Sequence, residues 1–552
     1  MAIEVSNAVF FYPDGSPVID ELSFRVPTGS VTALVGPNGV GKTTILNLIA
    51  GDLDLFEGSI RSDTEIGYMR QNPGFDDELS ATVLDALALS LPGNLKVIHA
   101  KLRVLYQRLA DHEDVGAELG TTLELWQQLG GYKEEAGWDQ ITSAVLGQRV
   151  AAAGERLLRE VSGGERKAII LRAYLLSSVP TLVLDEPDNF LDLFSKDWLE
   201  GELKRTSKTV LMVSHDRALL STAVDRMVVL EHSGSWTHEG NYRTFRKARR
   251  VRAERLAKDL TAWDNEERRL YKYYRLMKAR AASSSANASR ANAAETRWNR
   301  FRDDGPPEPP PPEREITTQF RGSRAGKEAV RITNFEVPDL ILPFDLLIYH
   351  EDRVALLGEN GVGKSTLLRK LVEEAEGRSV NDPPDPPVKF GPNAVVGYFS
   401  QENTLPDESG NLITIMSRHF PNDQVSRNAL GRYGLAKHDR HKYSQLSGGQ
   451  RARVQLIIME TLQPNVLFLD EPTDNLDLES ILVIERSLLD LKATQVAITH
   501  DREFTRIFDR WIVFDKDGLV GEVLDRNLAV EMVSGRRFSL LDTEGVKLLT
   551  RY

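Results

Sequence analysis

The chain of 552 residues carries one set of motifs twice, in the same order. A glycine-rich run at 36–44 recurs at 358–366, and a Ser-Gly-Gly run at 162–164 recurs at 447–449. An Asp-Glu pair and a histidine, each at the end of an apolar run, also occur twice at a constant spacing of 285 residues. We therefore predict an α/β protein that contains two copies of one domain.

Each glycine-rich run has the form Gly-x-x-x-x-Gly-Lys-Ser/Thr, which is a phosphate-binding P-loop between a strand and a helix. Its backbone N–H groups and the helix dipole favour phosphate oxygens. Lys42 and Lys364 are predicted to reach the β- and γ-phosphates, and Thr43 and Ser365 to offer a hydroxyl to Mg²⁺. The remaining predicted nucleotide contacts of the two loops are Gly36, Asn38, Gly39, Gly41 and Thr44, and Gly358, Asn360, Gly361, Gly363 and Thr366.

Two carboxylates follow an apolar run in each half, which predicts a buried strand that ends beside the P-loop. We expect Asp185 and Asp470 to hold the Mg²⁺ shell, and Glu186 and Glu471 to polarise the attacking water. His215 and His500 also end apolar runs. A single histidine in such a place is usually structural, but two at the spacing of the carboxylates favour a contact with the γ-phosphate.

The order P-loop, glutamine, Ser-Gly-Gly, Asp-Glu and histidine resembles the ATP-binding cassette (ABC) family. The resemblance implies two cassettes that close head to tail around two ATP molecules, with each P-loop facing the Ser-Gly-Gly signature of the other cassette. It pairs Lys42 with the signature at 447–449, and Lys364 with the signature at 162–164. It also implies that the signature residues contact the nucleotide, namely Ser162, Gly163, Gly164, Ser447, Gly448 and Gly449. Gln71 and Gln401 are implied to contact both the nucleotide and Mg²⁺.

Some positions depart from the family pattern. The first signature is Val161-Ser162-Gly163-Gly164-Glu165, where Leu-Ser-Gly-Gly-Gln is common, and the loop at 188–192 reads Asp-Asn-Phe-Leu-Asp instead of Thr-Asn-His-Leu-Asp. We expect the two sites to hydrolyse ATP at different rates. Tyr12 is placed to stack on adenine in the first cassette, and Phe335 is a weak candidate in the second.

Insertions divide the rest of the chain. The first half has 45 more residues between Gln71 and Ser162, and the helical pattern over 95–126 predicts a helical arm at about 93–140. The second half has an insertion of 8 residues, which we assign to a surface loop at the proline-rich run 382–387. Apolar residues at helical spacing between the halves predict an antiparallel hairpin. We expect a first cassette at 1–241, a hairpin linker with a proline-rich end at 242–325, and a second cassette at 326–552.

Charge is distributed unevenly between the linker and the cassettes. The whole chain has a net charge of −12, whereas residues 241–300 hold 17 Lys plus Arg and 6 Asp plus Glu. Basic helices bind phosphate backbones through counterion release, and Tyr242, Tyr271, Tyr273, Tyr274 and Trp298 lie among these charges. The alternative is a solvated helical pair whose aromatic rings form its own seam.

Two cassettes in one chain, an arm in the first and a hairpin linker entered through Gly240-Asn241-Tyr242 are similar to the ABC-F branch. That resemblance implies an ATPase that binds the ribosome, through ribosomal RNA or tRNA, and acts near the peptidyl-transferase region in translation control or antibiotic resistance. The main alternative is the ATPase subunit of a membrane transporter. A DNA-repair ATPase with tandem cassettes would carry zinc-binding cysteines, and cysteine is absent here. A protein that closes on ATP without hydrolysing it would not need the two intact carboxylate pairs.

The sequence shows neither a signal peptide nor an apolar stretch long enough to span a membrane. The absence of cysteine fits a reducing compartment. We therefore expect a cytoplasmic monomer that closes its two cassettes on each other.

Overall fold

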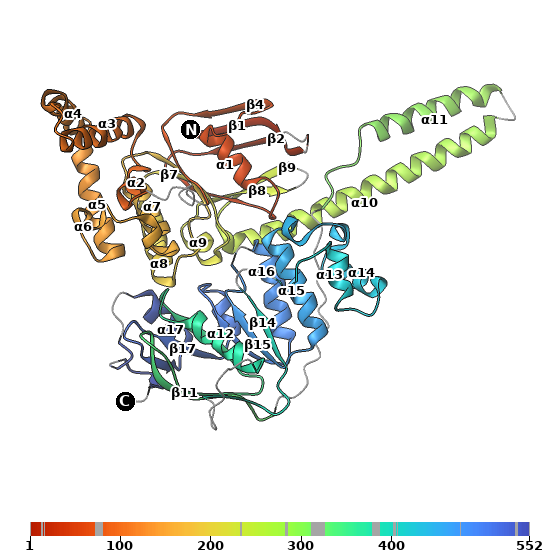
Figure 1. The fold of residues 1–552 in the computed structure, drawn as a ribbon. Coiled ribbons are helices and arrows are strands. Elements are labelled where there is room, and N and C mark those ends of the chain that lie inside the picture. Colours follow the sequence, from red (N-terminus) through yellow and green to blue (C-terminus); the bar gives the residue numbers. More distant parts are fainter. Residues whose placement is uncertain are drawn as a thin grey trace.

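The computed structural model describes residues 2–12, 15, 17–71, 81–231, 234–281, 285–310, 326–377, 387–400, 405, 407–474, 476–535, 539–541 and 543–550. Two α/β bodies are stacked on each other, and a long helical hairpin extends from their junction (Figure 1). The predicted fold, two tandem cassettes joined by an antiparallel hairpin, is confirmed. Apart from Pro387, the loop expected at 382–387 lies outside the described residues.

The first cassette is built on a six-stranded sheet whose order is β5-β6-β7-β3-β8-β9. All neighbouring pairs are parallel except β8 with β9. The strands are β5 Ile66–Met69, β6 Thr181–Asp185, β7 Thr209–Val213, β3 Val31–Val35, β8 Arg226–Glu231 and β9 Gly234–Glu239. A second, antiparallel sheet has the order β2-β1-β4, with β2 Pro17–Val26, β1 Ile3–Phe11 and β4 Glu57–Ser62.

The second cassette repeats this plan with a seven-stranded sheet of order β14-β15-β16-β12-β17-β18-β19. Its strands are β14 Val396–Phe399, β15 Val466–Asp470, β16 Thr494–Ile498, β12 Arg353–Gly358, β17 Arg510–Phe514, β18 Val520–Val523 and β19 Val546–Leu548. The accompanying antiparallel sheet contains β11 Ile341–Tyr349, β10 Glu328–Val337 and β13 Val388–Phe390.

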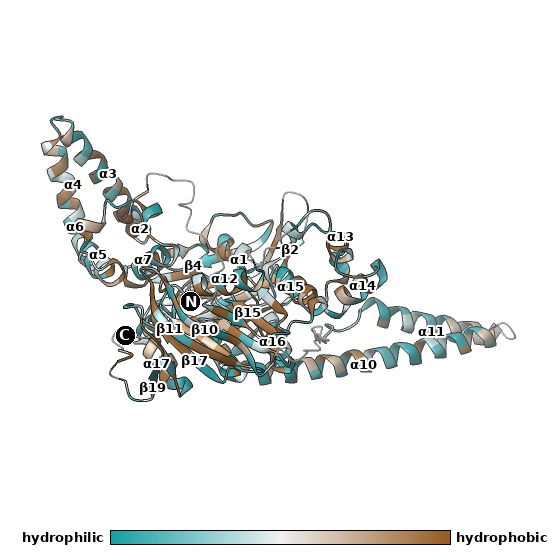
Figure 2. Ribbon diagram, turned by 60° about the horizontal axis from the view of Figure 1, so that its bottom comes forward, coloured by the Kyte–Doolittle hydropathy of each residue, from teal (hydrophilic) through white to brown (hydrophobic). Residues whose placement is uncertain are grey.

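Helices cover the parallel sheets, and this explains why their central strands are mostly apolar. In the first cassette they are α1 Lys42–Ala50, α2 Val83–Ala88, α6 Val150–Ala153, α7 Gly163–Leu176, α8 Leu193–Arg205 and α9 Arg217–Thr222. In the second they are α12 Lys364–Ala375, α13 Leu412–Ser417, α14 Asp423–Arg432, α15 Gly448–Leu462, α16 Leu478–Asp490 and α17 Arg526–Ser534. Strands β3, β6, β7, β15 and β16 are buried at every residue, as parallel strands covered on both faces should be. Figure 2 shows β15 among brown, hydrophobic strands in the body of the ribbon.

The insertion in the first cassette forms an arm at the end of the molecule opposite the hairpin (Figure 1). It consists of α3 Gly93–Ala110, α4 Gly116–Gln128 and α5 Gly131–Leu146. The helical pattern over 95–126 therefore corresponds to two helices, because the chain turns after α3 at His112, which has a φ of 64°. Trp126 is fully buried. A Cβ atom at Gly131 would lie 2.1 Å from the ring of Trp126, so only glycine fits there.

The linker is a hairpin of α10 Tyr242–Ala281 and α11 Ser285–Asp303. Its aromatic rings pack between the two helices. Tyr274 and Trp298 stack with centroids 5.5 Å apart, and Trp263 stacks on Phe301 at 5.3 Å. The Trp298 indole N–H donates to Glu267 Oε1 at 2.8 Å. These rings form the hairpin's own seam, and among the tyrosines expected to contact a partner Tyr273 and part of Tyr271 are exposed to solvent.

Within the described residues, no helix combines the length and the apolar character needed to cross a membrane.

Replacing Trp298 with alanine should loosen the hairpin without affecting the cassettes. The change removes the Tyr274 stack and a hydrogen bond, and each aromatic pair contributes roughly 0.5–1.5 kcal/mol. Amide hydrogen exchange in α10 and α11 should accelerate, while exchange in the central strands stays the same. Tyr273→Ala is the matched control, because Tyr273 is 49% exposed; equal acceleration in both variants would contradict the seam.

Candidate functional site

Each P-loop connects a buried strand to a helix. Gly41 and Gly363, both with a φ of 98°, stand immediately before α1 and α12. This left-handed conformation suits glycine and lets the loop turn its N–H groups inward. The loops at 36–44 and 358–366 thus have the strand and helix context that their sequences predict.

The two P-loop lysines fold back over their own loops. The Lys42 ammonium donates to the carbonyl oxygens of Gly36 at 2.9 Å and Pro37 at 3.1 Å. Lys364 donates to the carbonyl oxygens of Gly358 at 2.8 Å and Glu359 at 2.7 Å. Burial lowers the pKa of Lys42 and lowers that of Lys364 to about 8. An anion in the loop would offset this cost of burying a positive charge.

A carboxylate pair stands at the end of β6 and of β15, where Asp185 and Asp470 are the last residues of these strands. The glutamates that follow have left-handed backbones, with a φ of 48° at Glu186 and 47° at Glu471. This conformation is strained for a residue with a side chain, and such strain tends to be retained at functional sites. Burial raises the pKa of Asp185 and of Asp470.

The two glutamates have different partners. Glu186 Oε2 accepts hydrogen bonds from the Gln71 amide at 2.6 Å and the Asn189 amide at 2.5 Å. Glu471 Oε2 accepts the backbone N–H of His500 at 3.1 Å, and its Oε1 lies 3.4 Å from His500 Nε2. Burial raises the pKa of Glu186, and burial together with Asp474 raises that of Glu471 to about 8.

The two histidines follow β7 and β16. Burial lowers the pKa of His215 to about 3 and brings that of His500 well below its ordinary value. Neighbouring lysines add to both shifts. Both imidazoles are therefore neutral at pH 7, and each can donate one N–H and accept at its other nitrogen.

The residues predicted for Mg²⁺ fit this cation in their chemistry. Ser365 Oγ donates to Asp470 Oδ1 at 3.2 Å, so a hydroxyl and a carboxylate oxygen lie side by side. Mg²⁺ prefers such oxygen ligands and usually takes one or two carboxylates together with substrate phosphates and waters. Thr43 and Asp185 are the corresponding pair in the first cassette. Gln401 lies outside the described residues.

The first P-loop faces the second signature across the junction of the cassettes. A cavity of about 940 Å³ is lined by 38–44 and Gln71 of the first cassette and by Ser447 and Gly448 of the second. Asp477 of the second cassette accepts the backbone N–H of Asn38 at 3.1 Å. We call this composite cavity site 1.

The second P-loop faces the first signature in the same way. A cavity of about 900 Å³ is lined by Lys364, Ser365, Thr366 and Glu471 together with Ser162 and Gly164 of the first cassette. The Asn360 amide donates to the carbonyl oxygen of Phe190 at 3.2 Å. We call this cavity site 2.

The signatures begin the helices that point at these cavities. Ser162 and Ser447 are the N-caps of α7 and α15, and each forms a capping box with the residue three positions later, Glu165 or Gln450. Each helix therefore presents its positive dipole end to the P-loop of the opposite cassette. This geometry suits an anion held between the two.

An aromatic ring lines site 1. Tyr12 is 45% exposed and lines the cavity, and its hydroxyl lies 3.1 Å from Thr44 Oγ1. Phe335, the weak candidate of the second cassette, is only 5% exposed and is absent from the lining of site 2. It packs on Phe344 inside the antiparallel sheet. Leu340, in the turn between β10 and β11, lines site 2 instead.

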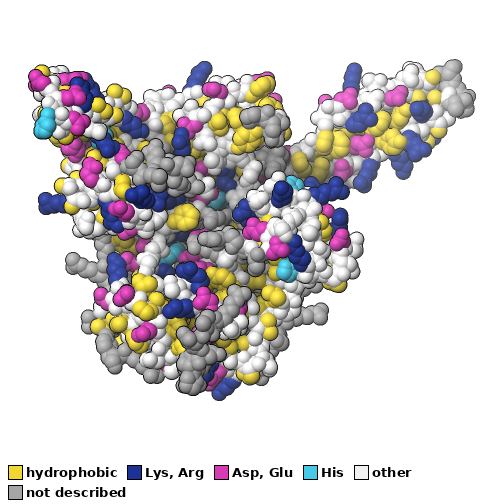
Figure 3. Space-filling view, in the orientation of Figure 1, with side chains coloured by type: hydrophobic (Ala, Val, Ile, Leu, Met, Phe, Trp, Pro, Cys, Tyr) yellow, Lys and Arg dark blue, Asp and Glu magenta, His cyan; other side chains and the backbone are white. Residues whose placement is uncertain are grey.

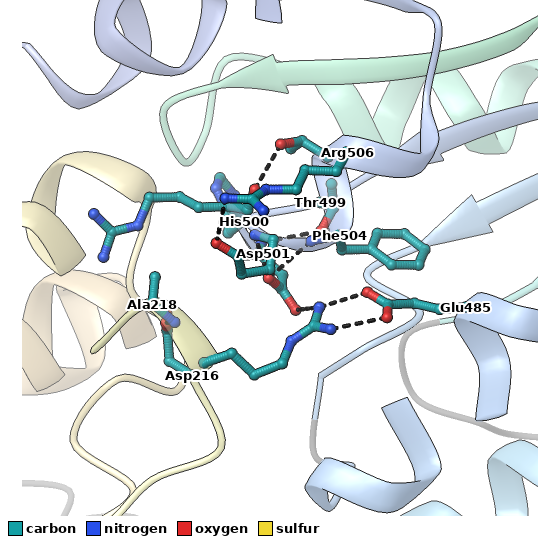
Figure 4. A network of polar contacts seen from close by, with 12 residues as sticks. Asp216, Ala218, Glu485, Thr499, His500, Asp501, Phe504 and Arg506 are labelled. Atoms are coloured by element: carbon teal, nitrogen blue, oxygen red, sulfur yellow. Dashed lines mark hydrogen bonds and ion pairs between the residues drawn. The ribbon is translucent and has the colours of Figure 1, made fainter. Parts of the chain in front are cut away.

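Two reciprocal ion pairs hold the cassettes together. Arg217 of the first cassette pairs with Glu485 at 2.5 Å and Asp501 at 3.0 Å, and Arg502 of the second pairs with Glu200 at 2.7 Å. Figure 4 shows Glu485 and Asp501 converging on one guanidinium at this junction. The sequence signal for these pairs was present, since Arg217 with Arg502, and Glu200 with Glu485, keep the spacing of 285 residues.

Apolar residues cross the junction beside the ion pairs. Leu193 of the first cassette is fully buried in the main core of the second, and Leu478 of the second packs against the core of the first. Helices α8 and α17 also pack on each other. The cassettes thus share part of their cores, and the described chain is in a closed arrangement.

One side of the junction buries an additional charged cluster. Lys196 lies 3.4 Å from Asp216 and donates to the carbonyl oxygen of His500 at 3.3 Å. Asp188 is buried nearby, and its burial together with the charge of Asp216 raises its pKa to about 6. In the second cassette, Thr473 and Ile481 occupy the positions of Asp188 and Lys196.

Asp188→Asn should stabilise the chain at neutral pH and not in acid. The pKa of Asp188 is about 6 in the folded chain and 3.8 ordinarily, so ionisation disfavours the folded state increasingly as the pH rises from about 4 to 6. Urea midpoints should rise in the variant at pH 7.5 and agree with the parent chain near pH 4. The exposed Asp54→Asn is the control; an equal gap at both pH values would contradict the raised pKa.

Comparison with known proteins agrees with this geometry. The model of the ABC transporter family matches residues 19–189 and 342–474. The chain is 37% identical to an antibiotic resistance protein of Mycobacteroides abscessus, over 95% of this chain and 99% of that protein. It is 28% identical to ABC transporter F family member 5 of Arabidopsis thaliana, over 96% and 77% of the two chains. It is also 28% identical to the energy-dependent translational throttle protein EttA of Mycobacterium tuberculosis, over 88% and 86%.

These matches and the two composite sites define an ATP-binding cassette protein. The chain belongs to the ABC family and, within it, to the ABC-F group of proteins with two cassettes.

Proposed function

We propose that the chain hydrolyses ATP with Mg²⁺ at site 1 and site 2. The observation that carries this proposal is that each P-loop lysine shares a cavity with the signature serine of the opposite cassette. Two sites of this kind are complete only when the cassettes are closed. ATP binding and closure are then one process, in which the γ-phosphate connects a P-loop to a helix N-terminus.

The side chains of each site divide the chemistry among them. The P-loop N–H groups and Lys42 or Lys364 bind the β- and γ-phosphates, and Asp185 with Thr43, or Asp470 with Ser365, would hold Mg²⁺, which supplies charge neutralisation at the phosphates. Glu186 and Glu471 orient the water and accept its proton. A raised pKa makes each carboxylate a stronger base in its ionised form.

The neutral histidines complete the arrangement. His215 and His500 can each donate an N–H to a γ-phosphate oxygen while they remain uncharged. Release of phosphate removes the group that attracts the opposite helix N-terminus, so the cassettes separate. Hydrolysis thereby resets a closed state that binding creates.

The double variant Glu186→Gln and Glu471→Gln should bind ATP and remain closed, because the carboxylates are lost while the P-loops are unchanged. Turnover should fall by about 10²-fold or more, as expected when a positioned base is removed. Phosphate release and retention of labelled ATP are the measurements. Glu124→Gln is a control at an exposed carboxylate of the arm helix α4, and wild-type turnover in the double variant would exclude these glutamates as bases.

The same proposal extends to a ribosomal partner, bound by the hairpin through ribosomal RNA or tRNA. Residues 241–300 hold 17 Lys plus Arg against 6 Asp plus Glu in a chain whose net charge is −12, and Figure 3 shows Lys and Arg side chains along the hairpin. Two relatives are named for antibiotic resistance and for control of translation. We infer action near the peptidyl-transferase region, in ribosome protection or translation control. A transporter ATPase subunit, the alternative, has no use for a basic hairpin.

The basic start of α10 should contribute to RNA binding through phosphate contacts. Replacing Arg243, Arg246, Lys247 and Arg250 with glutamine should weaken ribosome pelleting and flatten its salt dependence. Each lost phosphate contact reduces the slope by roughly 0.7–0.9. ATP binding should be spared. Arg249 is left in place because it pairs with the second cassette.

The matched control replaces four exposed cassette arginines, Arg25, Arg61, Arg205 and Arg331, with glutamine. It has the same change in net charge without a change in the hairpin. Unchanged pelleting and slope in the hairpin variant, or an equal loss in the control, would exclude the start of α10 as an RNA-binding surface. Copurification with membranes instead of ribosomes would favour the transporter alternative.

A further inference from the structure

The hairpin contacts both cassettes near its base. Tyr242 and Phe245, in the first turn of α10, are buried in the core of the first cassette. One turn further on, the Arg249 guanidinium pairs with the carboxylate of Glu479 on α16 of the second cassette. The two side chains are 31% and 21% exposed. The start of α10 is thus buried in the first cassette and joined to the second cassette by an ion pair.

Glu479 lies beside a residue of site 1. Asp477 is the N-cap of α16, and its Oδ1 accepts the backbone N–H of Ser480 at 2.8 Å. Its Oδ2 accepts the backbone N–H of Asn38, in the first P-loop, at 3.1 Å. One carboxylate therefore begins α16 and also contacts the P-loop across the junction. Any displacement of the first turn of α16 moves Asp477 relative to Asn38.

A second contact holds the same helix to the same side of the molecule. Glu485, two turns further along α16, pairs with Arg217 at the start of α9, and α9 packs against α10. Figure 1 shows α16 directly below the first half of α10. Helix α16 is therefore held at two points by α9 and α10.

Site 2 has no equivalent of this connection among the described residues. The helix that corresponds to α16 is α8, which is capped by Asp192 as α16 is capped by Asp477. The residue at the position of Glu479 is Phe194, which cannot form an ion pair with a basic helix. Asn360 contacts the carbonyl oxygen of Phe190 through its side chain instead of meeting a capping carboxylate through its backbone.

We propose that Arg249 is a positioning residue of site 1, which links the hairpin to hydrolysis in that site through a connection that site 2 lacks in the described part of the chain. The proposal rests on the hydrolysis proposed above. Arg249 acts through Glu479 and Asp477 and does not touch the nucleotide. Because such coupling is reciprocal for binding, a partner that holds the hairpin changes the ATP affinity of site 1 by the factor with which ATP changes hairpin binding.

The test separates the two sites by silencing one glutamate at a time in the full chain. In the Glu471→Gln background turnover comes from site 1, and in the Glu186→Gln background it comes from site 2. Arg249→Ala should reduce single-turnover phosphate release by about fivefold in the first background, at the low end of typical couplings, and leave the second unchanged. Arg255→Ala is the control, because Arg255 pairs with Asp259 within α10.

A charge exchange distinguishes positioning from general damage. Arg249→Glu and Glu479→Arg should each lower turnover in site 1, and the two together should restore it, since the pair is re-formed in reverse. Equal loss in both backgrounds, no loss in either, or failure of the exchange to restore site 1 would overturn the proposal. Persistent turnover in the double glutamine variant would instead overturn the proposed hydrolysis at these glutamates.

Discussion

The structure depends on two helix N-termini, each of which faces the P-loop of the other cassette. Ser162 and Ser447 begin helices whose positive ends lie opposite the P-loop of the partner cassette. A cassette alone has a loop that can hold phosphate but lacks this second charge. The stacked sheets, the exchanged leucines Leu193 and Leu478 and the reciprocal ion pairs all maintain this opposition. Removing a buried ionic partner would leave an unpaired charge in the junction, which is far more costly than losing an exposed pair.

The junction is pseudosymmetric in its backbone and asymmetric in its charges. Arg217 and Arg502 repeat each other, but Asp188 and Lys196 are matched by uncharged residues in the second cassette. Glu186 is bound to amide side chains, whereas Glu471 is bound to His500. Two sites with one architecture thus place their carboxylates in different surroundings. A chain with duplicated domains can divide tasks in this way without changing its fold.

The sequence was sufficient for the fold and insufficient for contacts between distant segments. P-loops and strand-terminal carboxylates are local patterns, and the helices and strands formed where those patterns predict them. Local periodicity could not reveal the turn at His112 or that Phe335 is covered by Phe344. The aromatic residues of the linker fitted both a binding surface and an internal seam, and only the pairing of α10 with α11 distinguishes these. The pairs across the junction depend on how the two cassettes dock, although the repeated spacing of 285 residues marked them.

The length of α10 converts a small rotation at its base into a larger displacement at its far end. The helix has 40 residues, so at 1.5 Å per residue it is about 60 Å long. A rotation of 1° at the embedded end then displaces the far end by about 1 Å, given a rise of 1.5 Å per residue. Rotations of a few degrees at the cassette junction are therefore magnified into movements of about as many ångströms at the far end of α10. The stacked aromatic rings between α10 and α11 stiffen the hairpin and so determine how much of that motion reaches the far end of α10.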